Sequence, residues 1–333
     1  MMADRTTPDT PADQAATTSG AATPADRAAT ASGAATTASP QQLAWNRRMA
    51  AAKKNWHVFL EDRTGVAGAI MLVVVILVAA FAPLIADRSL LDVTQNLDQP
   101  RYAPPSVEHP LGTDNHGREL WARLVWGARV SLIVGLAATA MSMIIGTIMG
   151  MAAGHFSGIV GGVIMRIIDF FLVLPSLLLA IVLSSVLERG VLTIVIAIGV
   201  TSWAGTARIV RAQTLSAESR LYIERARVLG AGHWHIIRTH LLPAVMPLVL
   251  ANTTLTVGSA IIAESTLAFL GLGDTTEQSW GTMLKNAMDV SAATSGYWWY
   301  ILTPGVAIVA VVLAFTLVGR AIETIANPTL RSR

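Results

Sequence analysis

Long apolar runs separated by polar stretches make up most of the chain after residue 64. A helix that crosses a bilayer needs about 20 mainly apolar residues, and it satisfies its backbone hydrogen bonds internally. Six runs meet this requirement, at about residues 65–86, 130–153, 162–187, 191–210, 244–270 and 300–322. The pattern therefore predicts an all-α membrane protein with six transmembrane helices.

The polar segment between the fourth and fifth runs has a helical period of its own. Two sets of positions in it repeat at helical spacing: Tyr222, Ala226 and Leu229, followed by Trp234, Ile237 and Leu241. This spacing predicts two short amphipathic helices. Gly230 and Gly232 between them permit a sharp turn, and Pro243 suits the first turn of the helix that follows. We expect an ordered elbow that presents a shaped surface to a partner.

Composition excludes a water-soluble globular protein. Apolar residues are 53% of the 333 residues, charged residues are 14%, and the mean hydropathy is +0.54. An ordinary soluble chain has roughly 25% charged residues. The chain has no cysteine, so it can form no disulfide, thiolate metal site or thiol nucleophile.

Basic residues indicate how the chain is oriented in the membrane. They cluster before the first run, around the elbow segment and after the last run, at Arg47, Arg48, Lys53, Lys54, Arg63, Arg208, Arg211, Arg220, Arg225, Arg227, Arg238, Arg320, Arg331 and Arg333. Lysine and arginine are enriched in cytoplasmic loops. We therefore expect both termini and the loop of residues 211–243 on the cytoplasmic side of a bacterial cell membrane.

The first 40 residues are rich in Ala, Thr, Pro and Ser, and residues 10–22 recur nearly unchanged as residues 23–35. Such a segment buries too little apolar area to offset the entropy of ordering it. We predict a disordered cytoplasmic tail over residues 1–45, then a basic juxtamembrane segment over residues 46–64. The first span with its outer loop follows over residues 65–129, and a core domain over residues 130–330.

Small residues and a proline mark positions of interest within the runs. Gly146, Gly150 and Gly154 repeat every four residues, a spacing that favours close packing against another helix. Pro175 interrupts the third run, either as a plain kink or as a flexing point for gating.

Charged side chains within the runs are candidates for a translocation pathway or gate, because an unpaired charge at mid-bilayer costs at least ~2.5 kcal/mol. Arg166 and Asp169 are spaced i, i+3 near the cytoplasmic end of the third run, so we expect an ion pair rather than a substrate contact. Glu264 falls about 30 Å along its helix from Pro243, near the outer surface. It is either an outer-gate residue or solvated, and the sequence slightly favours solvation.

The chain lacks the patterns of a catalytic subunit. Its only lysines are Lys53, Lys54 and Lys285, and none precedes a hydroxyl residue as in a phosphate-binding loop. His233, His235 and His240 lie close together, but no carboxylate or cysteine completes a zinc pattern. No nucleophile elbow is present either. We therefore expect a non-enzymatic chain without a metal or cofactor of its own.

The elbow resembles the "EAA" cytoplasmic loop of permease subunits of ABC importers. The matching positions are Glu224, Ala226, Gly230, Leu242 and Pro243. The resemblance implies a type I importer fold and assigns the elbow, with Tyr222 and Leu229, to coupling with an ATPase subunit. Arg225 and Arg320 depart from the family pattern, which has alanine and often an acidic residue at these places.

Two further blocks are similar to the dipeptide and oligopeptide branch of these permeases, which also includes nickel permeases. They are residues 109–114 with 117–118 and 127–132, and residues 267–273 with 279–281. The resemblance covers roughly residues 55–330. It implies an importer of short peptides, with a second similar permease, two ATPase subunits that bind ATP and Mg²⁺, and an external peptide-binding protein as partners.

Two alternatives remain open from the sequence. The same architecture could carry nickel or another small solute. An ion-driven secondary transporter could also have six helices with a broken third span, but it would need carboxylates near the midplane and would leave the elbow unexplained.

Overall fold

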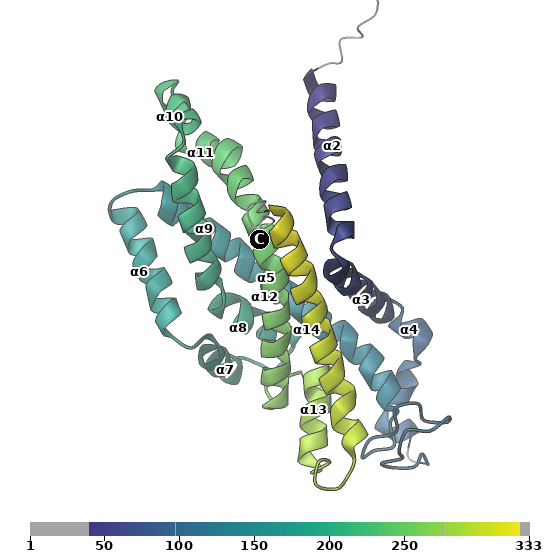
Figure 1. The fold of residues 1–333 in the computed structure, drawn as a ribbon. Helices are drawn as coiled ribbons and strands as arrows, with labels where there is room; N and C mark the ends of the chain where they lie inside the picture. Colours follow the sequence, from purple (N-terminus) through teal and green to yellow (C-terminus); the bar gives the residue numbers. More distant parts are fainter. Residues whose placement is uncertain (1–39, 97, 275, 327–333) are drawn as a thin grey trace, which may run out of the picture. The chain divides into compact units, whose positions relative to one another are not determined.

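The computed structural model describes residues 40–96, 98–274 and 276–326, which are almost entirely helical (Figure 1). Of the predicted tail of residues 1–45, residues 1–39 lie outside the described residues. Helix α2 (Pro40–Glu61) begins within that predicted tail, five residues before its expected end at residue 45, and covers most of the predicted basic segment. The helical bundle consists of the described residues from Lys54 onward.

The first apolar run forms α3 (Arg63–Ala80), which is followed by the single turn α4 (Ala82–Ile85). Asp62 caps α3, because its carboxylate accepts hydrogen bonds from the backbone N–H groups of Thr64 and Gly65 at 3.0 and 3.2 Å. Two 3₁₀ turns, η1 (Arg88–Leu91) and η2 (Val93–Gln95), begin the loop that leads to α5.

Helix α5 (Leu120–His155) has 36 residues and packs against both α9 and α12. It begins well before the predicted start at residue 130. At 1.5 Å per residue it is about 54 Å long, more than the ~30 Å of a bilayer core. The glycine prediction is confirmed, since a Cβ on Gly146, Gly150 or Gly154 would lie within 2.5–2.8 Å of α9 atoms.

Two spans are bent helix pairs. Helices α6 (Ile159–Val173) and α7 (Ser176–Val186) meet at 87°, with Pro175 at the break. Helices α8 (Val191–Thr201) and α9 (Trp203–Glu218) meet at 40° across Ser202. A proline explains the first break, because it has no N–H to donate to the preceding turn. The sequence did not predict the second break.

The elbow segment forms α10 (Leu221–Val228) and α11 (His233–Ile236), followed by the π-helical turn η3 (Ile237–Leu241) and α12 (Leu242–Phe269). Pro243 lies in the first turn of α12 as predicted. However, the second predicted amphipathic helix is not separate from the fifth apolar run, because α11, η3 and α12 form one continuous helical stretch of 37 residues. Pro243 has no backbone N–H to donate to the preceding turn, and the helix has π-type hydrogen bonding directly before this proline.

Helices α13 (Trp280–Asp289) and α14 (Trp298–Ala326) complete the bundle, and α14 runs beside α12 (Figure 1). Four unbroken helical stretches among the described residues are long and apolar enough to cross a membrane, and counting each bent pair as one span gives six. The predicted all-α membrane fold is therefore confirmed. Helices α10 and α11 lie at one end of the bundle, the α10 end, and α13 lies at the other, the α13 end (Figure 1).

Candidate functional sites in the bundle

An exposed apolar surface covers α10 and α11, beyond the end of α9. We call it the elbow surface, and it consists of Leu221, Tyr222, Val228, Leu229 and Trp234. Leu229 is 87% exposed and Trp234 is 72% exposed. Several large apolar side chains left exposed on two adjoining short helices indicate a contact with a partner or with lipid.

The side of the elbow that faces the spans is packed into a buried apolar cluster. Ile223 of α10, Ile236 of α11 and Leu241 of η3 are buried in one cluster with Ala217 of α9. Gly230 has φ +86°, a backbone conformation that side chains disfavour, and it makes the turn between the two helices. The predicted bend is therefore confirmed, and the apolar core beneath it holds the two short helices against the spans.

A group of polar side chains around the buried His155 joins four helices at the α10 end. Glu218 at the end of α9 is hydrogen-bonded to His155 of α5 and to Arg227 of α10. The other ring nitrogen of His155 lies 2.9 Å from Nδ1 of His233 in α11. The side chain of His155 is fully buried. We call these four residues the polar joint, and it ties the elbow to α5.

The predicted coupling residues all lie on or beside the elbow. Glu224 and Pro243 are exposed, and Ala226 and Leu242 are half-buried. Tyr222 and Leu229 belong to the elbow surface. These positions are available to a partner, and their coupling role stays a prediction.

The predicted ion pair between Arg166 and Asp169 is not formed in the structure. Both residues instead line a cavity of about 530 Å³ between α6 and α9, together with Arg211. Arg166 is exposed and Asp169 is half-buried. Helical spacing does not force a pair here, because water in an open cavity solvates both charges.

The prediction that Glu264 is solvated is wrong. Its side chain is 1% exposed, and its carboxylate accepts hydrogen bonds from Ser131 of α5 at 2.9 Å and from Ser265 at 3.3 Å. Glu264 thus links α12 to α5. The structure does not bring Arg166, Asp169, Pro175 and Glu264 together into one site.

A buried charged network lies at the α13 end, where the loop before α5 meets α5 and α14. Asp114 accepts hydrogen bonds from Arg118 at 2.7 Å and from Arg123 at 2.8 Å. Arg123 is fully buried and also donates to Gln278 at 2.9 Å and to Tyr300 at 3.1 Å. The sequence did not predict this network, although Asp114 and Arg118 fall in the block of residues 109–114 with 117–118.

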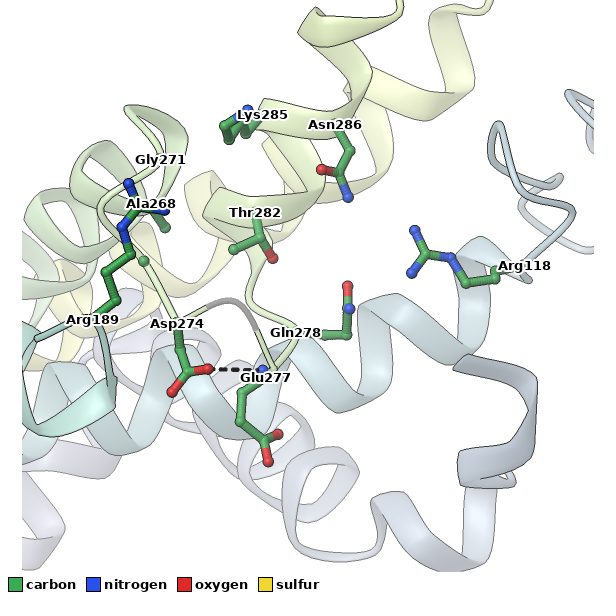
Figure 2. Close-up of a pocket in the computed structure, with 11 residues that line it drawn as sticks. Arg118, Arg189, Ala268, Gly271, Asp274, Glu277, Gln278, Thr282, Lys285 and Asn286 are labelled. Atoms are coloured by element: carbon green, nitrogen blue, oxygen red, sulfur yellow. Dashed lines mark hydrogen bonds between the residues drawn. The ribbon is translucent and has the colours of Figure 1, made fainter. Parts of the chain in front are cut away.

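A small pocket of about 280 Å³ opens beside this network (Figure 2). It is lined by Arg189, Asp274, Glu277, Thr282, Lys285 and others, drawn from the α7–α8 loop, the α12–α13 loop and α13. Glu277 pairs with Arg88, and Lys285 pairs with Asp289. The charged lining is therefore largely neutralised by neighbouring side chains.

Asp274 is held in its charged form within this pocket. Its partial burial would raise the pKa of the carboxyl, but hydrogen bonds from the Thr276 hydroxyl and from the N–H groups of Thr276 and Glu277 outweigh burial and lower the pKa below its usual value. The carboxylate thus organises the turn that leads into α13.

These features define a multi-span membrane protein with an ordered elbow outside its spans. Residues 123–332 match the family described as the binding-protein-dependent transport system inner membrane component. Residues 52–105 match the N-terminal TM domain of oligopeptide transport permease C. The chain therefore belongs to the family of inner membrane components of binding-protein-dependent transport systems, and it works as one component of a transport complex with other subunits.

Several curated proteins are similar over most of their length. The dipeptide transport system permease protein DppC of Bacillus subtilis is 36% identical over 277 residues, which cover 83% of this chain and 85% of the relative. The oligopeptide transport system permease protein OppC of the same organism is 35% identical over 274 residues, covering 82% and 88%. The di/tripeptide transport system permease protein DppC of Pseudomonas aeruginosa is 34% identical over 287 residues, covering 84% and 93%.

Proposed function

We propose that this chain is a permease subunit of an ATP-driven importer that moves di- and oligopeptides into the cytoplasm. The relatives named for dipeptide, di/tripeptide and oligopeptide transport support the peptide substrate over nickel or another small solute. Two ATP-binding subunits, a second similar permease and an extracytoplasmic peptide-binding protein complete the complex. The α10 end faces the cytoplasm, as the clustering of basic residues indicates.

The elbow surface is the observation that carries this proposal. Its apolar side chains are exposed, while the opposite side of the same two helices is buried against the spans. A partner that docks there can move the bundle, because α11 continues without a break into α12 and the polar joint links the elbow to α5. The chain itself needs no nucleotide site in this mechanism, since the ATP-binding subunits hydrolyse ATP and bind its Mg²⁺.

An ion-driven secondary transporter is less well supported. Such a transporter requires ionisable groups at the substrate site. Glu264 is buried against Ser131 and Ser265 between α5 and α12, and Asp169 lines a separate cavity with Arg166 and Arg211, so the two carboxylates do not form one ion site. The elbow surface would also have no role in it.

A charge on the elbow surface tests the proposal. Leu229→Asp places a carboxylate in the proposed apolar contact, and we expect co-purification of the ATP-binding subunits to fall at least tenfold. Val107→Asp is the matched control, because Val107 is fully exposed but lies in the loop before α5. Retention of the ATP-binding subunits by the Leu229→Asp protein would refute the docking role.

A further inference from the structure

A polar cavity of about 470 Å³ lies where both bent spans face α12. Its polar lining includes Ser176, Ser202, Thr206, Asn252, Thr256 and Ser259. None of the described residues that line it carries a charge. The α12 residues Asn252, Thr256 and Ser259 are spaced i, i+4, i+7, so they share one helical face about halfway along that helix.

The breaks in the two spans add backbone polar groups to this cavity. The carbonyl of Phe171 would receive the N–H of the residue four positions later, which is Pro175 and has none. Ser176 begins α7 directly after this break, and Phe171, Leu172, Leu174 and Ser176 all line the cavity. The second break, at Ser202, opens onto the same cavity.

Such a lining does not suit contact with lipid. Backbone groups without partners cost several kcal/mol each in hydrocarbon, and interrupted helices at membrane depth occur where they are buried in protein or line an aqueous space. The Asn252 side-chain amide donates to the Thr206 hydroxyl at 3.1 Å, while the side-chain oxygen Oδ1 of Asn252 accepts no hydrogen bond from any described residue. Gly205 on the cavity wall has open space around it, since an added Cβ would meet no atom within 4 Å.

We propose that this cavity is a section of the translocation path and binds the backbone of the passing peptide through neutral hydrogen bonds. Hydroxyl groups, the Asn252 amide and the free carbonyl at the α6–α7 break match the alternating N–H and C=O groups of a peptide. Because the lining is uncharged, the section does not select among peptides by the charge of their side chains. This inference rests on the proposed function.

Cysteine labelling tests whether the cavity is aqueous and whether peptide occupies it. The chain has no cysteine, so Thr256→Cys and Ser259→Cys each give a single thiol without further engineering. Leu250→Cys is the matched control, because Leu250 is 57% exposed on the opposite face of the same helix. Gly205→Cys provides a third cavity position with room for the side chain.

In the assembled complex we expect a charged, membrane-impermeant thiol reagent to label the cavity positions at least tenfold faster than position 250. Saturating peptide should slow labelling of the cavity positions at least threefold. Labelling as slow as at position 250, or no effect of peptide in variants that still import it, would overturn the inference. A wild-type complex that imports no peptide would instead refute the proposed function, whatever the labelling shows.

Charge selectivity gives an independent test. Asn252→Asp keeps the side-chain shape but adds a negative charge to the path. We expect the ratio of acidic to basic tripeptide uptake to fall at least fivefold, while the wild-type ratio stays close to one when binding-protein delivery is saturated. An unchanged ratio in the variant would contradict peptide contact at Asn252.

Discussion

At the residue scale, the buried charged network at the α13 end depends on Asp114. It is fully buried, and it is the only anion placed between Arg118 and Arg123 in the described network. Two buried guanidinium groups depend on this carboxylate, since removing one partner of a buried ion pair leaves the other charge uncompensated. The network fixes the loop before α5 to α5 and, through Tyr300, to α14.

Asp114→Ala is therefore expected to destabilise the bundle by about 3–5 kcal/mol. Thermal unfolding of the purified protein in detergent measures this as a lowered Tm. Asp289→Ala serves as the control, because it removes the exposed pair with Lys285, and exposed pairs contribute at most about 1 kcal/mol. Equal Tm values for the two variants would show that the buried network adds no stability.

Asp62 permits a prediction about pH. The hydrogen bond from the Thr64 hydroxyl, together with those from the N–H groups of Thr64 and Gly65, lowers the pKa of the carboxyl despite some opposing desolvation. A lowered folded-state pKa means that the cap stabilises α3 above the unfolded pKa of about 4 and is lost as pH falls through the folded value.

Hydrogen exchange at the start of α3 measures this cap. At neutral pH, Asp62→Ala should speed exchange of the Thr64 and Gly65 amides about fivefold, the equivalent of a lost cap of about 1 kcal/mol. The difference between the two proteins should diminish as the pH falls below about 4 and disappear at the pH where the carboxyl of folded Asp62 is protonated. A difference that persists at that pH would show that the charged cap is not its cause.

At the scale of elements, the packing of α5 against α9 depends on the three glycines. A Cβ on Gly150 would lie 2.5 Å from the carbonyl oxygen of Ala207, which is backbone and cannot move aside cheaply. Overpacking of this kind typically costs 1–3 kcal/mol. Gly305 in α14 differs, because a Cβ there would meet nothing within 4 Å.

We therefore expect Gly150→Ala to lower the Tm and Gly305→Ala to leave it unchanged or raise it slightly, since alanine favours helix over glycine by roughly 0.5–1 kcal/mol. Thermal unfolding in detergent compares the two. A Gly150→Ala protein as stable as the wild type would contradict the close contact between α5 and α9.

The sequence predicted the features that depend only on residues close together in the chain. Six apolar runs, the elbow turn at Gly230 and the break at Pro175 follow from periodicity and backbone chemistry. The break at Ser202 has no glycine or proline to signal it. Burial of Glu264 depends on Ser131, which is 133 residues away and reaches it only through the packing of α5 on α12. The i, i+3 spacing of Arg166 and Asp169 predicted a pair that an open cavity makes unnecessary.

At the scale of the whole molecule, the elbow, the polar joint and the spans form one mechanical connection. Helix α11 continues into α12, and His155 links the elbow to α5, which packs against both α9 and α12. A push on the elbow surface therefore reaches the helices that line the polar cavity. The coupling of ATP hydrolysis to peptide movement would use this connection.

Weakening the polar joint should partly uncouple ATP hydrolysis from peptide import. Glu218→Gln removes the charge that holds His155 and Arg227, and we expect more ATP to be hydrolysed per peptide imported, with docking of the ATP-binding subunits retained. Reconstituted complexes in liposomes give both rates. An unchanged ratio would indicate that the polar joint has no part in transmission.

The most direct measurement is a cross-link from the elbow surface. With Leu229→Cys in the cysteine-free chain, a short thiol-to-amine cross-linker should join this protein to an ATP-binding subunit in native membranes, and the yield should change when ATP is added. Val107→Cys should give no such product. If position 229 forms no cross-link to a nucleotide-hydrolysing subunit in membranes that import peptide, the account of the elbow as the coupling element is wrong.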